Sequence, residues 1–218
     1  MSSIGQVHLY YGEGKGKTTA ATGLAVRAFG AGYDVLVVQF LKEGDSSEMA
    51  VLKDLLGITV LAEKVMPNMS FAMTEEEKAA TSACHENIWK KAMDWVLKQN
   101  PDIASRNTCG RTANDIRTAS DARTAGDIST ACDVRPGKES PAGRMLILDE
   151  IIGAIESGLF PEEKVLAFLD QRPADIEVVM TGRNPSPALL DRADYRSKIV
   201  CDGHPYNNGT AARKGIEF

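Results

Sequence analysis

The chain has 218 residues, of which 43% are hydrophobic and 25% are charged, and its net charge is −5. These values exclude a wholly disordered or collagen-like chain, and they disfavour general adhesion to nucleic acid. No apolar run approaches the ~20 residues of a membrane helix, and the first residues lack a signal-peptide pattern. We therefore expect a cytoplasmic protein without membrane or nucleic-acid partners. The cysteines form no C-x-x-C pair, which predicts reduced thiols rather than a zinc site.

The N-terminal part of the chain is predicted to run strand, loop, helix, strand. A short strand over residues 6–11 leads into a glycine-rich loop at residues 12–19. The helix after this loop has an apolar stripe at helical spacing, made of Ala21, Leu24, Ala25 and Ala28. Gly30 marks its end, and the almost continuous apolar run at residues 35–40 predicts a strand covered on both faces.

The same alternation continues toward the C-terminus. A weaker strand is expected at residues 58–61, and residues 74–77 fit a capping box that opens a long helix. The buried stripe of that helix is predicted to be Ile88, Ala92, Trp95 and Val96. Buried strands follow at 145–150 and 176–181, with a helix beginning at Pro161 between them. Alternating strands and helices predict an α/β fold with a doubly wound, mostly parallel sheet.

One segment departs from this alternation. Residues 111–134 repeat every six residues, beginning Arg-Thr-Ala-Asn-Asp-Ile. A six-residue period forms no stripe on a helix, and the segment has almost no large apolar side chains to offset the entropy of ordering. We expect one domain over residues 1–218, interrupted at about 101–143 by a disordered or loosely ordered surface insertion. The alternative is a short hairpin or docking arm.

The glycine-rich loop carries the strongest chemical signal. Gly12, Gly16, Lys17 and Thr18 follow the phosphate-loop pattern G-x-x-x-x-G-K-[ST] with one residue fewer, and Tyr11 holds the usual first glycine position. Such loops surround phosphate oxygens with backbone N–H groups and a helix N-terminus. A plain glycine turn between strand and helix is the alternative. We expect the triphosphate to be held by Gly12, Glu13, Gly14, Lys15, Gly16, Lys17, Thr18 and Thr19.

An acidic pair is the second chemical signal in the sequence. Asp149 and Glu150 end a buried strand, where phosphate-loop enzymes place the acid that holds Mg²⁺ or its water. The alternative is an acidic helix N-terminus that complements the helix dipole. Together with Thr18, the pair predicts a magnesium site in a fold of the P-loop NTPase (RecA-like) type.

Several motifs together resemble one family, the P-loop ATP:corrinoid adenosyltransferases of cobalamin biosynthesis and salvage. In family order, the matching segments are residues 12–21, 38–42, 148–151, 181–184, 204–206 and 214–218. The resemblance implies that ATP binds in reverse orientation. It also implies that the Co(I) of a reduced corrinoid attacks the 5′ carbon of ATP and expels triphosphate.

The resemblance also implies residue roles. Lys17, Thr18 and Glu150 would carry catalysis by stabilising the leaving triphosphate, with Mg²⁺ held on Thr18 and Glu150. Asp149 would orient the metal shell, and Arg183 would reach the nucleotide. A homodimer and a reduced flavoprotein as electron donor are expected on the same ground.

The corrinoid side departs from the family pattern. The family's Phe-Thr-Trp segment corresponds to Phe71 and Met73 here, with methionine at the tryptophan position. Ordinary core or loop packing is the alternative role for both. Some members also cover the corrinoid with a longer N-terminal helix, so we expect another part of this protein to do so.

Two rival functions remain at this point. The first is a P-loop ATPase or kinase in which Glu150 activates water or an acceptor, and the second is a nucleic-acid-binding module that uses ATP as a switch. The chain lacks the basic stripe of the second. The histidines are not predicted to form a metal set: His8 and His85 are interpreted as strand and helix side chains, and His204 as part of the C-terminal motif.

Overall fold

A computed structural model describes residues 5–42, 47–54, 58–63, 73–97, 142–209 and 211–216. Six strands of this part of the chain form one sheet, in which every pairing is parallel. The order across the sheet is β3-β2-β4-β5-β1-β6. The strands are β1 (Val7–Tyr11), β2 (Asp34–Gln39), β3 (Ile58–Ala62), β4 (Arg144–Asp149), β5 (Ile176–Gly182) and β6 (Tyr195–Lys198). The predicted parallel α/β fold is confirmed.

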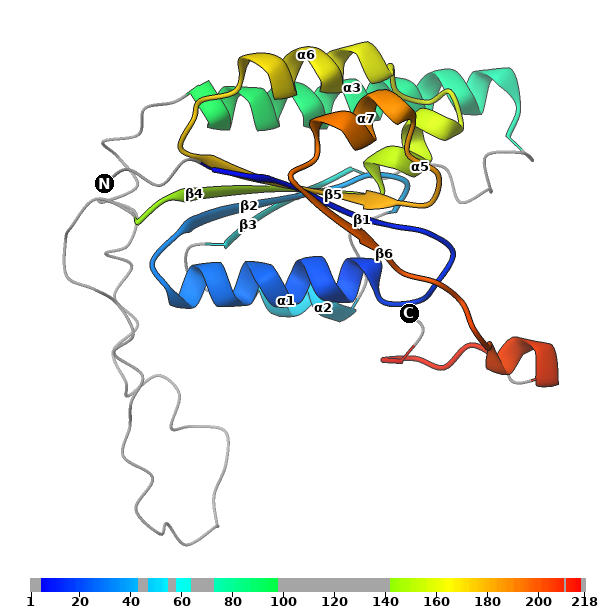
Figure 1. Cartoon of the computed structure of the whole chain (residues 1–218). Helices are drawn as coiled ribbons and strands as arrows, with labels where there is room; N and C mark the ends of the chain where they lie inside the picture. Colours follow the sequence, from blue (N-terminus) through cyan, green and yellow to red (C-terminus); the bar gives the residue numbers. More distant parts are fainter. Residues whose placement is uncertain are drawn as a thin grey trace, which may run out of the picture. The chain divides into compact units, whose positions relative to one another are not determined.

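Helices cover both faces of this sheet (Figure 1). One face carries α1 (Lys17–Gly30) and α2 (Ser47–Asp54). The other carries α3 (Glu75–Leu97), α5 (Ile151–Glu156), α6 (Glu162–Gln171) and α7 (Pro187–Arg192). A 3₁₀ turn spans Pro205–Asn208. Apolar side chains are buried in two clusters, one on each face, and β2 is buried along its whole length as its apolar run predicts.

Helix α1 begins directly at the glycine-rich loop. Its buried side chains are Ala21, Ala25 and Ala28, as predicted, whereas Leu24 is only partly buried. Because alanine has a short side chain, this stripe lets the helix axis lie close to the sheet. The first turn of α1 is thereby held against the ends of the strands.

Helix α3 begins with the predicted capping box. The backbone N–H of Thr74 donates to Glu77 Oε2 at 2.8 Å, and the Glu77 N–H donates to Thr74 Oγ1 at 3.2 Å. The prediction for Trp95 was wrong, because it is only partly buried, and Trp89 packs on Phe160 in the core instead. Positions 85, 88, 89, 92 and 96 share one helical face, and residue 95 lies at its margin.

Some elements have no clear signal in the sequence. All four residues of β6 are exposed, so this edge strand lacks the apolar pattern of the inner strands. Helices α5 and α7 have six residues each, which is too short for a helical period to be recognised. None of the described helices is long and apolar enough to cross a membrane. The predicted insertion lies outside the described residues, apart from its last two positions, 142 and 143.

Candidate nucleotide site

The glycine-rich loop connects β1 to α1 at the carboxyl end of the sheet. Gly12 and Gly16 both have φ of 111°, a left-handed conformation that favours glycine. The Gly12 N–H donates to the carbonyl oxygen of Arg183 at 3.0 Å, and the Gly14 N–H donates to that of Ile199 at 2.9 Å. The loop is therefore tied to the segments that follow β5 and β6.

Close packing explains two of the glycines independently of any ligand. A Cβ on Gly12 would lie 2.5 Å from the carbonyl oxygen of Ile199, and one on Gly14 would lie 2.4 Å from that of Val200. A Cβ on Gly16 would meet nothing within 4 Å, so only its φ favours glycine. The loop thus has its shape before a phosphate arrives.

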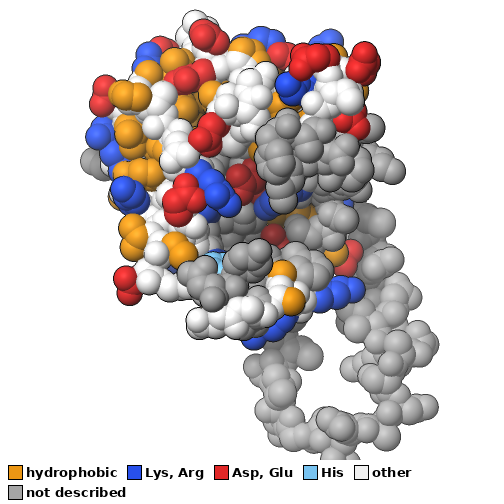
Figure 2. Space-filling view, turned by 90° about the vertical axis from the view of Figure 1, so that its right-hand side faces the viewer, with side chains coloured by type: hydrophobic (Ala, Val, Ile, Leu, Met, Phe, Trp, Pro, Cys, Tyr) orange, Lys and Arg blue, Asp and Glu red, His pale blue; other side chains and the backbone are white. Residues whose placement is uncertain are grey.

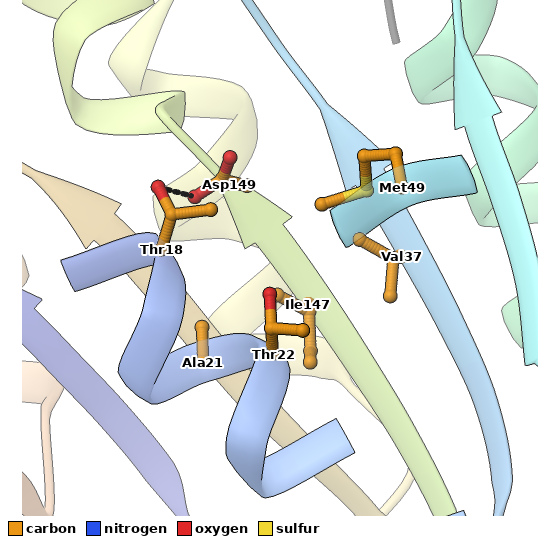
Figure 3. A pocket seen from close by; sticks show the side chains of 7 residues that line it. All are labelled: Thr18, Ala21, Thr22, Val37, Met49, Ile147 and Asp149. Atoms are coloured by element: carbon orange, nitrogen blue, oxygen red, sulfur yellow. Dashed lines mark hydrogen bonds between the residues drawn. The ribbon is translucent and has the colours of Figure 1, made fainter. Parts of the chain in front are cut away.

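Asp149 is the centre of a hydrogen-bond network beside this loop, and Figure 3 shows its bond with Thr18. Its Oδ1 accepts from Thr18 Oγ1 at 2.9 Å and from Thr181 Oγ1 at 2.8 Å. Its Oδ2 accepts from Gln39 Nε2 at 3.1 Å. The carboxylate is only 1% exposed, and its donors come from α1, β5 and β2. The network therefore fixes the start of α1 against the ends of the inner strands.

Glu150 follows Asp149 in a left-handed conformation, with φ of 60°. This conformation is energetically unfavourable for a non-glycine residue, and such backbone strain is concentrated at functional sites. Burial, followed by the charge of Asp149, raises the pKa of the Glu150 carboxyl. Three cations oppose this rise, namely Lys42, Lys17 and Arg183. The acidic pair thus lies in a strongly charged setting.

The basic residues of the loop make contacts of their own. Lys17 Nζ donates to the carbonyl oxygen of Gly14 at 2.9 Å, and Arg183 Nη1 donates to Glu13 Oε2 at 2.9 Å. Two further loop residues that are predicted to hold the triphosphate, Lys15 and Thr19, are exposed. Figure 2 faces this end of the sheet, where basic and acidic side chains border a hollowed centre. The structure thus brings the predicted loop, acidic and Arg183 residues together.

Three residues of the network were not predicted as site residues. Lys42 Nζ lies 3.5 Å from both Asp149 Oδ2 and Thr18 Oγ1. Gln39 and Thr181 each donate to Asp149. All three lie in the motif segments 38–42 and 181–184. Each also lies at or just beyond the carboxyl end of a buried strand that faces the loop.

The oxygen atoms at this site suit a hard cation such as Mg²⁺. The Thr18 hydroxyl donates a hydrogen bond to Asp149, and its oxygen keeps lone pairs for a further partner. Gln39 Oε1 is buried and has no hydrogen-bond partner among the described residues. In the described part of the chain, no three His, Cys, Asp or Glu side chains gather as a complete metal site. This donor set fits magnesium that also takes phosphate and water oxygens.

The predicted corrinoid residues are described only in part. Phe71 lies outside the described residues, and Met73 is partly buried just before α3. His8 lies on β1, where it hydrogen-bonds Glu177 and stacks on Tyr195. His85 is fully buried on α3.

Comparison with known proteins identifies relatives of the whole chain. A family model described as ATP:corrinoid adenosyltransferase BtuR/CobO/CobP matches residues 3–218. A corrinoid adenosyltransferase of Pseudomonas aeruginosa is 26% identical over 98% of this chain and 84% of its own length. One of Escherichia coli K12 is 27% identical over 98% and 86%. An uncharacterised Nostoc protein, all2391, is 26% identical over 97% of this chain, which spans 48% of that relative.

Proposed function

Because the chain belongs to the ATP:corrinoid adenosyltransferase family, we propose that it transfers the 5′-deoxyadenosyl group of ATP to the Co(I) of a reduced corrinoid. A bond forms between cobalt and the 5′ carbon while the bond from that carbon to the triphosphate oxygen breaks. Its electron pair leaves with triphosphate. The attacking cobalt carries no proton, so the reaction requires no general base.

The observation that carries the proposal is the set of cations around the loop and Asp149. The negative charge of the triphosphate grows as it leaves, and preorganised positive groups stabilise that charge. Lys17 lies on the loop itself, Lys42 lies beside Thr18, and Arg183 follows β5. We infer that Lys17 exchanges its contact with the Gly14 carbonyl for a phosphate oxygen when ATP binds.

Magnesium would be held at the same place. Bound Mg²⁺ supplies two positive charges to the phosphate oxygens. We assign its direct or water-mediated contacts to Thr18, Asp149 and Glu150, with Gln39 holding the Asp149 carboxylate in position. The bonds from Thr18, Thr181 and Gln39 already fix this carboxylate before the metal binds.

The corrinoid would bind on the sugar side of ATP. We assign Phe71 and Met73 to its face, where apolar side chains exclude water from cobalt. The methionine is flexible, so it excludes water less rigidly than an indole ring. We further propose that the protein is a homodimer that receives electrons from a reduced flavoprotein.

An ATPase or kinase is the second candidate, and the environment of Glu150 favours it. Burial and Asp149 raise the pKa of this carboxyl, which moves it toward the range of a general base. Such an enzyme would release ADP, whereas adenosyl transfer releases triphosphate.

The proposal is tested with ATP, Mg²⁺ and chemically reduced cobalamin, followed by the corrinoid absorption spectrum. We expect the wild-type protein to convert the Co(I) spectrum to that of the adenosylated product. Lys17→Ala removes a phosphate contact and should abolish turnover. Lys90→Ala, at an exposed position on α3, is the matched control and should retain it. Full activity of Lys17→Ala would contradict the role assigned to the loop.

A further inference from the structure

His85 is a buried imidazole that the proposed reaction does not use. It lies on α3, is 0% exposed, and joins two segments that are distant in sequence. Its Nε2 lies 3.3 Å from the backbone nitrogen of Leu41, and its Nδ1 lies 3.3 Å from the carbonyl oxygen of Leu159. The ring also meets the Phe40 ring in an edge-to-face arrangement, with 5.3 Å between ring centres.

These two partners determine which ring nitrogen carries the proton. A backbone N–H only donates, so Nε2 must accept from Leu41. A carbonyl oxygen only accepts, so Nδ1 must carry the hydrogen that faces Leu159. The ring is therefore neutral in one tautomer. Burial also lowers the pKa of His85, and the bond to Leu159 partly opposes that change.

The turn that His85 contacts is strained and lies at the nucleotide site. Leu41 has φ of 57°, a left-handed conformation that is sterically unfavourable for a leucine. The preceding Phe40 N–H donates to the carbonyl oxygen of Asp149 at 2.9 Å. Both amides of the turn are thus held, one by β4 and one by α3. The next residue is Lys42, whose Nζ lies 3.5 Å from Asp149 Oδ2.

We propose that His85 is a positioning residue: by accepting the Leu41 N–H, it holds the strained turn that directs the Lys42 ammonium toward the triphosphate. This inference rests on the proposed function only in assigning Lys42 to the phosphates. The hydrogen bond that would transmit the effect is present without any nucleotide.

Two substitutions separate the hydrogen bond from the volume of the ring. His85→Leu fills a similar space but cannot accept from Leu41 or donate to Leu159. His85→Gln keeps an acceptor and a donor in one side chain. Circular dichroism and thermal unfolding establish that each variant folds. If His85→Leu does not fold, the tautomer of the wild-type imidazole and the Leu41 exchange in His85→Gln and the wild-type protein still test the proposal.

The first measurement needs no nucleotide. Nitrogen NMR of the wild-type imidazole should show the hydrogen on Nδ1 and a bare Nε2. Loss of the acceptor should speed exchange of the Leu41 amide hydrogen about tenfold in His85→Leu, and His85→Gln should restore much of the protection. A hydrogen on Nε2, or equal Leu41 exchange in all three proteins, would overturn the proposal.

The second measurement tests the path through Lys42. Magnesium-ATP affinity is compared among the wild-type protein, His85→Leu, Lys42→Ala and the double variant. If His85 acts through Lys42, the double variant should bind ATP as weakly as Lys42→Ala alone. If the losses in ATP affinity from the two single substitutions add in the double variant, this path is overturned.

In the same four proteins, corrinoid adenosylation shows whether the loss lies in kcat or in KM for ATP. We expect kcat to fall about tenfold in His85→Leu and KM for ATP to rise with it, because Lys42 faces phosphate charge that is present in bound ATP and grows in the transition state. A wild-type protein that binds ATP but never adenosylates corrinoid would refute the proposed function alone. The non-additive ATP affinities would still support the role of His85.

Discussion

At the scale of single residues, the site depends on the hydrogen bonds that the Asp149 carboxylate accepts. Three donors from three different elements bind its two oxygens, the Lys42 ammonium lies 3.5 Å from Oδ2, and the carboxylate is almost fully buried. Removing one donor to a buried charge costs more than an ordinary surface hydrogen bond, because the desolvation of the charge is no longer compensated. These donors are therefore sensitive points of both stability and function.

Thr181 provides the sharpest substitution in this network. Its hydroxyl donates to Asp149 Oδ1 and also accepts from the Glu150 N–H at 2.8 Å. Thr181→Val keeps the shape but loses both bonds, so we expect a loss of about 1–3 kcal/mol in unfolding free energy and weaker magnesium-ATP binding. Urea unfolding and ATP titration measure these effects. Thr181→Ser keeps the hydroxyl and should stay close to wild type, and an equally unstable serine variant would argue against the network.

At the scale of elements, a glycine of the loop and a glycine in the middle of α1 differ in how they tolerate a side chain. A Cβ on Gly14 would meet the Val200 carbonyl oxygen at 2.4 Å, whereas Gly23 is exposed in the middle of α1 with nothing within 4 Å. Gly14→Ala should cost about 1–3 kcal/mol and weaken ATP binding, because the loop or the segment after β6 must shift. Gly23→Ala should instead stabilise the protein by about 0.5–1 kcal/mol.

Thermal unfolding and ATP titration of both alanine variants test this contrast. A Gly14→Ala protein with unchanged ATP affinity would show that the loop does not depend on its packing against that segment. The Gly23→Ala variant controls for the effect of adding a methyl group close to the loop.

Asp34, the first residue of β2, should make the stability of the folded state depend on pH. Burial raises the pKa of Asp34 from 3.8 to about 6, although Arg144 and the Val35 N–H oppose this. The folded state therefore holds this proton more tightly than the unfolded state. The stabilisation of the folded state by this proton is complete below pH 3.8, and it is lost as the pH rises toward about 6. Above that pH, the buried carboxylate costs up to about 3 kcal/mol.

Asp34→Asn removes the ionisation and keeps an acceptor for the Val35 N–H. We expect its unfolding free energy to exceed that of the wild-type protein above about pH 6 and the difference to shrink as the pH falls toward 3.8. Denaturant unfolding across this range measures the difference. A constant difference between the two proteins at every pH would contradict the assigned cause.

The sequence predicts elements better than it predicts their neighbours in the sheet. The β2 run, the α3 capping box and the strand before Asp149 all carry local signals, and all three are present. The exposed β6 carries none, because its edge position requires no apolar pattern. The strand order places β4 beside β2, which brings Gln39 and Lys42 to Asp149, and no local pattern specifies that pairing.

At the scale of the whole molecule, the repeat at residues 111–134 interrupts the chain between α3 and β4. Its composition offers few side chains that a folded core would need. We expect deletion of these residues to leave adenosyl transfer and thermal stability nearly unchanged, as enzyme assay and calorimetry would show. Insoluble protein or lost catalysis would assign the repeat a structural or functional role.

The loop and the acidic pair could be predicted to lie together, because their signals each lie within a short run of sequence; their roles toward a nucleotide stay predictions. The prediction for the corrinoid residues rests on a resemblance in which Met73 replaces a tryptophan, and it stays a prediction. The role of His85 has no sequence signal at all. It depends on the packing of α3 against the turn after β2, which only the folded structure shows.

The central claim is that this loop holds triphosphate as a single leaving group. Phosphorus NMR of a reaction with magnesium-ATP and reduced cobalamin tests it directly by identifying the phosphate product. We predict triphosphate in equal amount to adenosylated corrinoid, with neither formed when cobalamin is omitted. Release of ADP and phosphate at the same rate with or without corrinoid would contradict the claim and identify an ATPase instead.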